Sequence, residues 1–222
     1  LVPGLVVLFD FVGVEAVGTA TIALLAIGLN GARAYDRDGL VDRPAAGWLA
    51  LTSAPTALLF GWLVAGRLDA DVFVSLLGVL LILLAVLVAF GRTIPQSAPD
   101  GEPGRGALLG GGLVVGAVSG TFAVGAGLLT VPLMMRVRHL QAHRAAATTA
   151  AAGIAGSLAA TIGHTLASNV VWAKLPPLLL GALVGSTLGA RMAGRLSARE
   201  VTNLLVAGLI TAAIPLLFKA VG

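Results

Sequence analysis

The sequence predicts an all-α, polytopic membrane protein built from two inverted repeats. Three observations predict this: an apolar composition, recurrent stretches long enough to cross a bilayer, and a second half that resembles the first. Hydrophobic residues make up 58% of the 222 residues and charged residues only 11%, whereas a soluble domain carries roughly 25% charged residues. The net charge of +4 comes from basic residues that are scattered singly, so a nucleic-acid surface is not indicated. The absence of cysteine excludes disulfides, thiolate metal sites and cysteine nucleophiles.

Six stretches have the length and apolarity of membrane helices, which need about 20 mostly apolar residues. The predicted spans are residues 16–32, 47–65, 72–91, 145–167, 173–193 and 200–219. Between the third and fourth spans, residues 93–106 contain Pro95, Pro99, Pro103 and several glycines. Such a composition is typical of a linker, and we expect it to join two membrane halves.

Residues 107–138 are apolar but are interrupted by the segment from Gly120 to Gly127. Glycine and threonine there favour an unwound turn, so we expect two half-length helices, 108–119 and 127–138, in a re-entrant hairpin. If the chain returns to its starting side, eleven arginines share one side against Arg67, Lys174 and Lys219; a single crossing divides the basic residues seven against seven. The positive-inside rule favours the first arrangement and places the Arg-rich loops in the cytoplasm, at the plasma membrane.

The two halves align at an offset of 128 to 129 residues. Ala65-Gly-Arg-Leu68 recurs as Ala193-Gly-Arg-Leu196, and Pro3 aligns with Pro132. Chance matching among Ala, Leu and Gly is the alternative. Three spans and a hairpin per repeat make an odd number of crossings, so the second copy, 107–222, would be inverted relative to the first, 1–92. Only two residues precede Pro3, whereas more than 20 residues of the second repeat precede Pro132, so we expect the first arm of the first hairpin to be missing from this chain.

The glycine-rich break is the best candidate for a substrate site. A broken helix exposes backbone N–H groups that attract an anion, and nearby hydroxyls add donors. The candidate residues in this segment are Ser119, Gly120, Thr121, Gly125, Gly127, Thr130 and Pro132. The alternative is helix packing, because Gly112, Gly116 and Gly120 are spaced by four. For Gly181, Gly185 and Gly189, which have the same spacing without a break, we expect packing.

Polar residues inside the spans provide further candidates. Thr19, Thr148 and Thr149 lie early in equivalent helices and either donate to substrate or bond to a carbonyl one turn back. Asn30 either lines a cavity or pairs across helices, because an unpaired buried amide is costly. His164 has either a substrate or pH-sensing role or that of a satisfied interfacial histidine. Asp10 and Glu15 are candidates for proton coupling.

Motifs in both halves of the chain resemble the sulfite exporter TauE/SafE family, also called the 4-toluene sulfonate uptake permeases. In the second half they are Gly112 to Pro132, His143-Arg-Ala-Ala-Ala-Thr-Thr149, His164 and Asn169-Val-Val-Trp172. In the first half they are Pro3, Ala16-Val-Gly-Thr19, Asn30-Gly31 and Gly39-Leu-Val-Asp42. Two departures are Gly125-Ala-Gly127 in place of a glycine triplet and Val171 where Asp is common. The resemblance implies transport of small organosulfur anions such as sulfite.

We therefore expect a secondary transporter for small anions, sulfite or organosulfonates, working by alternating access in the lipid bilayer without a cofactor or metal. A homo-oligomer is a further candidate partner state. The alternatives are a non-transporting membrane scaffold, which predicts closely packed hairpin tips, and an intramembrane serine hydrolase using Ser119 and His164, which requires the two side chains within hydrogen-bond reach.

Overall fold

The computed structural model describes residues 2–8, 11, 13–64, 67–90, 104–124, 127–193 and 198–221. Within these ranges all regular elements are helices. The helices are α1 (Val2–Leu8), α2 (Gly13–Arg37), α3 (Arg43–Leu59), η1 (Phe60–Val64), α4 (Ala70–Phe90), α5 (Arg105–Phe122), α6 (Gly127–Val137), α7 (Ala142–Leu166), η3 (Trp172–Lys174), α8 (Leu175–Ala193) and α9 (Ala198–Val221).

Each of the six predicted spans is a helix, which confirms the all-α class. Among the described residues, five segments are long and apolar enough to cross a membrane: Gly13–Ala32, Arg43–Val64, Ala70–Ala89, Arg105–Phe122 and His143–Leu166. One of these differs from expectation. We predicted a half-length first arm at 108–119, but α5 has 18 residues, about 27 Å at 1.5 Å per residue. The backbone stays helical through the glycines of α5, and the helix ends only where Ala123 adopts a left-handed conformation.

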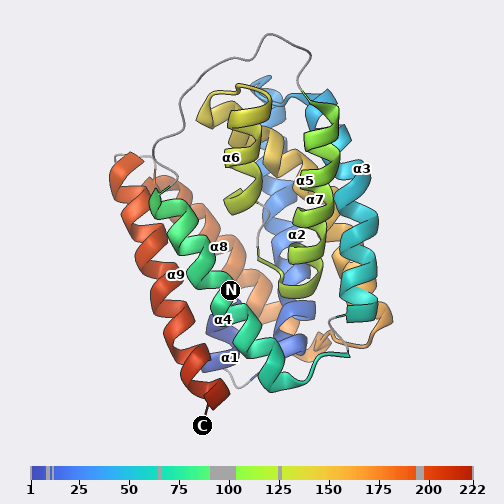
Figure 1. The fold of residues 1–222 in the computed structure, drawn as a ribbon, viewed down its shortest axis with the longest axis vertical. Coiled ribbons are helices and arrows are strands. Elements are labelled where there is room, and N and C mark those ends of the chain that lie inside the picture. The colour runs from blue at the N-terminus through green and yellow to red at the C-terminus, as the bar shows by residue number, and fades with distance from the viewer. Residues whose placement is uncertain are drawn as a thin grey trace.

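The second arm of the interrupted region is short, as the sequence predicts. α6 has 11 residues, which extend about 16 Å, roughly half the hydrocarbon core of a bilayer. Figure 1 shows that the chain turns at the lower end of α5 and runs back up through α6.

The helices form two packed groups around two hydrophobic clusters. One cluster joins α1, α2, α4 and α9 and includes Val6, Val17, Phe73, Leu77 and Leu216. The other joins α3, α5, α6 and α7 and includes Leu49, Leu108 and Met134. α4 packs against α9, α3 packs against both α5 and α7, and α2 packs against α7 (Figure 1). α2 and α7 therefore lie at the centre, where the groups meet.

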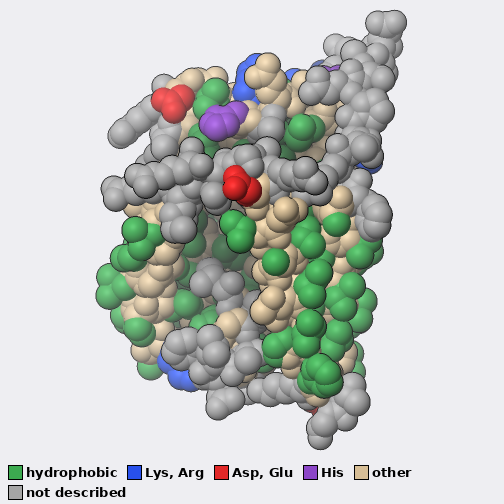
Figure 2. Space-filling model, turned by 90° about the vertical axis from the view of Figure 1, so that its left-hand side faces the viewer, with side chains coloured by type: hydrophobic (Ala, Val, Ile, Leu, Met, Phe, Trp, Pro, Cys, Tyr) green, Lys and Arg blue, Asp and Glu red, His purple; other side chains and the backbone are tan. Residues whose placement is uncertain are grey.

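The outer helices present apolar side chains to their surroundings. Exposed leucines, valines, isoleucines and phenylalanines lie on α4, α8 and α9, and Phe218 is 77% exposed. Figure 2 shows hydrophobic side chains over the middle and lower parts of one face, while its histidine and acidic side chains lie in the upper part. This surface suits a hydrocarbon environment, so the chain is a multi-pass membrane protein.

Candidate substrate-binding cavity

The break between α5 and α6 is built from local hydrogen bonds. α5 ends because Ala123 adopts a left-handed conformation, with φ 47°. The Ala123 N–H donates to the Ser119 carbonyl at 2.9 Å, and the Ser119 hydroxyl donates to the Val124 carbonyl at 3.2 Å. Ser119 therefore satisfies backbone groups on the far side of the turn and fixes the direction in which the chain leaves α5. Gly125 lies outside the described residues.

A cavity of about 320 Å³ opens beside this break. It is enclosed by α2, α3, α5, α6 and α7, so both halves of the sequence contribute to it. Its apolar walls come from residues such as Leu24, Ile27, Leu49, Val115 and Val131. None of the described residues that line it is Asp, Glu, Lys, Arg or His. The described lining therefore offers a ligand neutral groups only.

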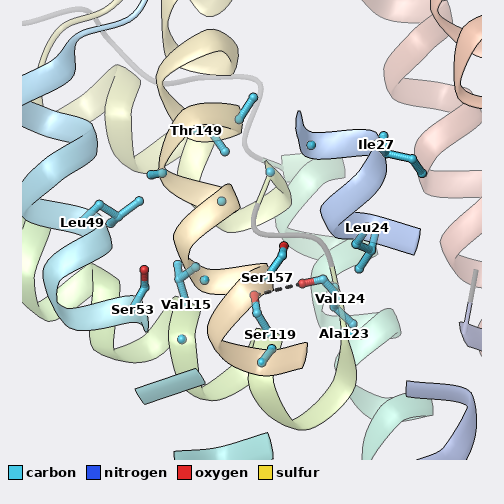
Figure 3. Close-up of a pocket in the computed structure, with 18 of the residues that line it drawn as sticks. Leu24, Ile27, Leu49, Ser53, Val115, Ser119, Ala123, Val124, Thr149 and Ser157 are labelled. Atoms are coloured by element: carbon cyan, nitrogen blue, oxygen red, sulfur yellow. Dashed lines mark hydrogen bonds between the residues drawn. The ribbon is translucent and has the colours of Figure 1, made fainter. Parts of the chain in front are cut away.

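The polar lining of the cavity consists of hydroxyl groups and backbone. The hydroxyl-bearing residues are Thr21, Tyr35, Ser53, Ser119, Thr149 and Ser157. Figure 3 shows Ser119 and Ser157 next to each other beside Val124, with Ser53 on the neighbouring helix. The Thr149 hydroxyl is buried without a hydrogen-bond partner, and such an orphan costs free energy unless something else satisfies it. The first residue of α6, Gly127, also lines the cavity, so the N-terminal end of this helix borders it.

The structure brings together three of the predicted site residues, Ser119, Gly127 and Thr149. The other predicted residues that the structure describes are not among its lining residues. Thr121 and Thr130 are buried, and the Thr130 hydroxyl has no partner. Pro132 lies exposed within α6, and Asn30 lies exposed on α2. Asn30 is therefore not a lining residue of this cavity, and its exposed position removes the cost of an unpaired buried amide on which its two expected roles were based.

Gly112, Gly116 and Gly120 form the close contact between α5 and α3. A Cβ added at Gly116 would meet the Ser53 backbone, and one at Gly120 would meet the Ala57 backbone. Absence of side chains here lets the two helices approach closely. Packing is thus the observed role of Gly112 and Gly120, whereas Gly116 also lines the cavity.

Thr19 and Thr148 link the halves through backbone contacts. The Thr19 hydroxyl donates to the Glu15 carbonyl at 2.8 Å and accepts from the Val171 N–H at 3.1 Å. The Thr148 hydroxyl donates to the Arg144 carbonyl at 2.7 Å and accepts from the Asp42 N–H at 3.0 Å. The bond to a carbonyl one turn back, which we considered for these residues, is present in both.

His164 is completely buried and lies outside the cavity lining. Its Nε2 lies 2.7 Å from the Gly120 carbonyl oxygen, so Nε2 carries the proton and donates. Its Nδ1 lies 3.5 Å from Nδ2 of Asn169. Gly61 of η1 packs against this pair, since a Cβ there would lie 3.2 Å from His164 Cδ2 and 3.4 Å from the Gly120 oxygen. His164 therefore fastens α7 to the lower part of α5.

At the opposite end of α5, Asp42 connects three segments. Its Oδ1 accepts from the Ala45 N–H at 3.1 Å and caps α3. Its Oδ2 accepts from Arg138 Nη2 at 2.8 Å and from Arg138 Nε at 3.1 Å. Partial burial opposes ionisation of Asp42, but the hydrogen bonds from Ala45 and Arg138 and the charges of Arg138 and Arg144 lower the pKa of this carboxyl from its ordinary value of 3.8.

Sequence reasoning missed Ser53, Ser157 and Tyr35 as lining residues. Ser53 and Ser157 lie inside long apolar helices, and only the packing of α3 and α7 against α5 shows that they face the cavity. Gly156 beside Ser157 gave a weak signal, because small residues in a membrane helix accompany close approach.

The fold and the cavity together define a polytopic helical membrane protein with an internal cavity whose described lining is uncharged and rich in hydroxyl groups. The chain belongs to the sulfite exporter TauE/SafE family, whose model matches residues 1–216, and it is thus a membrane transporter. The chain has no significant match among curated proteins or among solved structures.

Proposed function

We propose that this chain is a secondary transporter that carries small anions, sulfite or organosulfonates, by alternating access. The observation that carries the proposal is the cavity beside the α5–α6 break. It combines hydroxyl donors, an orphaned Thr149 hydroxyl and the start of α6. Neutral donors and a positive helix end bind an anion while leaving it free to depart, as transport requires.

We further propose that residues 1–92 and 107–222 form inverted repeats joined by 93–106. The pattern of helix contacts supports this. α2 and α7 both have 25 residues, begin 129 positions apart and pack together. The α1–α2 contact corresponds to α6–α7, and α2–α8 corresponds to α7–α3. The matched hydrogen bonds of Thr19 and Thr148 also obey this correspondence, because Val171 lies 129 positions after Asp42.

In this proposal α5 and α6 form the re-entrant arm that carries substrate contacts to the interior of the bilayer. The start of α3, the start of α5 and the end of α6 lie at the same end of the molecule (Figure 1). Arg43, Arg105 and Arg136 belong to these helix ends, so we assign that end to the cytoplasm and the membrane to the plasma membrane.

The competing functions receive less support. A scaffold requires closely packed tips, but the break borders a cavity of about 320 Å³. A serine hydrolase requires Ser119 to bond His164, but the Ser119 hydroxyl donates to Val124 and His164 Nε2 donates to Gly120.

Uptake of labelled sulfite and 4-toluenesulfonate into proteoliposomes tests the proposal. Gly153 lines the cavity, and a Cβ there meets no atom within 4 Å, so Gly153→Leu should fill the site and abolish flux without disturbing the fold. Gly110→Leu is the matched control, because Gly110 also has free space but lies outside the lining. Equal flux in the two variants, or no flux in the unaltered protein, would overturn the proposal.

A further inference from the structure

The candidate cavity holds few hydroxyl groups that are free to donate to a ligand. The Thr21 hydroxyl already donates to the Gly18 carbonyl at 2.7 Å. The Ser119 hydroxyl donates to the Val124 carbonyl. The lining hydroxyls without a hydrogen bond among the described residues belong to Tyr35, Ser53, Thr149 and Ser157. An anion in the cavity therefore meets a small number of neutral donors.

Ser53 on α3 and Ser157 on α7 lie close together in the cavity (Figure 3). A Cβ added at Gly156, the residue before Ser157, would lie 3.8 Å from Ser53 Oγ. Ser53 is only 4% exposed, and a buried hydroxyl without a partner is satisfied when a ligand accepts its hydrogen bond. Thr149 precedes Ser157 by eight positions on α7, about 12 Å along the helix axis. A compact anion between Ser53 and Ser157 is thus beyond the reach of Thr149.

The described lining contains no charge that balances the charge of a ligand. None of these residues is Lys, Arg or His, and the start of α6 supplies a partial positive charge of about half a unit. The cost of moving an ion from water into a low-dielectric site grows with the square of its charge, so a dianion costs about four times as much as a monoanion of the same size. Attraction to a fixed partial charge grows only in proportion to the charge of the ligand. The balance in this cavity therefore turns against a second negative charge.

We propose that this cavity binds singly charged sulfur oxyanions and rejects doubly charged ones. This charge preference rests on the proposed function, to which it adds the ionic form of the substrate. For sulfite, the form that binds is hydrogen sulfite and not the sulfite dianion. Among organosulfonates, those with one sulfonate and no further ionised group are accepted, whereas disulfonates and sulfocarboxylates are excluded.

Competition between matched anions in proteoliposomes tests the charge preference. The tracer is whichever of labelled 4-toluenesulfonate and labelled sulfite the uptake assay shows to be carried. Sulfamate is compared with sulfate, and 4-carbamoylbenzenesulfonate is compared with 4-sulfobenzoate. In each pair a neutral amino group replaces one oxygen of the dianion with little change in size. We expect the singly charged member of each pair to inhibit tracer uptake at a concentration lower by about tenfold or more.

Raising the pH through neutrality provides a second measurement, because it converts hydrogen sulfite into the dianion and leaves the charge of sulfamate unchanged. Inhibition by unlabelled sulfite, relative to inhibition by sulfamate at the same pH, should weaken as the pH rises. A ratio that stays constant would contradict the binding of hydrogen sulfite alone.

The double variant Ser53→Ala/Ser157→Ala tests whether the preference belongs to this cavity. It should raise the inhibitory concentration of sulfamate by about tenfold or more, whereas Ser75→Ala on α4, whose hydroxyl bonds the Asp71 carbonyl, should leave it unchanged. Equal inhibition by the two members of either pair, or a double variant without effect, would overturn the charge preference while leaving the proposed transport intact. Absence of uptake for both tracers would overturn the proposed function and the charge preference with it.

Discussion

Thr19 on α2 and Thr148 on α7 make the same two hydrogen bonds in opposite halves of the protein. Each hydroxyl donates to the carbonyl four residues earlier and accepts from a backbone N–H of the other half, Val171 for Thr19 and Asp42 for Thr148. Both side chains are fully buried. The two threonines fasten the loops of each half onto the central helix of the other.

Replacing Thr148 with valine should destabilise the protein, because the Asp42 N–H would lose its acceptor. An unsatisfied buried donor costs about 1–3 kcal/mol, and Thr148→Ser should recover most of this because the hydroxyl remains. Thr19→Val should have a similar effect through the Val171 N–H. Denaturant unfolding in detergent measures these differences. If Thr148→Val and Thr148→Ser unfold with the same free energy, the hydrogen bond is not stabilising.

The contact between Asp42 and Arg138 should make stability depend on pH in the acidic range. Because the folded state lowers the pKa of Asp42, the contribution of this group is fully present above the unfolded pKa of about 3.9 and is lost as pH falls through the lower folded pKa. Asp42→Asn should therefore be less stable than the unaltered protein at pH 6, and the difference should shrink toward pH 3. Unfolding free energies at a series of pH values test this. A difference that stays constant with pH would contradict the ionic role of Asp42.

Gly120→Ala should destabilise the α3–α5 contact. The new Cβ would lie 2.8 Å from Ala57 Cα and 3.0 Å from the Ala57 carbonyl carbon, and backbone atoms cannot move aside without shifting a helix. Overpacking of this kind costs about 1–3 kcal/mol. Gly110→Ala on the same helix is the control, because its Cβ meets open space and alanine favours the helix. Thermal unfolding should separate the two variants, and equal melting temperatures would show that α3 and α5 are not held this closely.

Ser53→Ala and Ser157→Ala should weaken substrate affinity without altering the fold. A hydrogen bond to a charged group contributes about 1.5–3 kcal/mol, so the KM for anion uptake should rise by roughly ten- to a hundredfold. Ser75→Ala on α4, whose hydroxyl bonds its own helix at Asp71, should leave KM unchanged. A KM unaffected by both cavity substitutions would remove these serines from the site.

Composition and periodicity were sufficient to predict the helices, because apolar stretches and charged breaks are local features. The predicted span 200–219 compares with Ala198–Val221 for α9, and 72–91 compares with Ala70–Phe90 for α4. The end of α5 was placed too early, since Gly120 stays helical while Ala123 adopts the left-handed conformation that ends it. The π-helical turn Phe60–Val64 was also not foreseen. It carries Gly61 against His164 and Gly120, a contact that depends on three separate segments.

Part of the lining of the candidate cavity was predicted. The break, with Ser119 and Gly127, was found from glycine spacing, and Thr149 from its place in an equivalent helix. Thr148 and Thr149 are adjacent in sequence, but a helix turns about 100° per residue, so one bonds the Asp42 backbone while the other lines the cavity. Ser53 and Ser157 could not be distinguished from packing residues until the faces of α3 and α7 were known.

Substrate protection of a single thiol in the cavity tests the central claim most directly. The chain has no cysteine, so Ser157→Cys introduces one thiol among the lining residues, and Ser75→Cys on α4 provides the control. We predict that a sulfonate-bearing methanethiosulfonate reagent modifies the thiol introduced at position 157 and stops uptake, and that excess 4-toluenesulfonate slows this modification while leaving the control thiol unaffected. Modification at the same rate with and without 4-toluenesulfonate would contradict anion binding in this cavity.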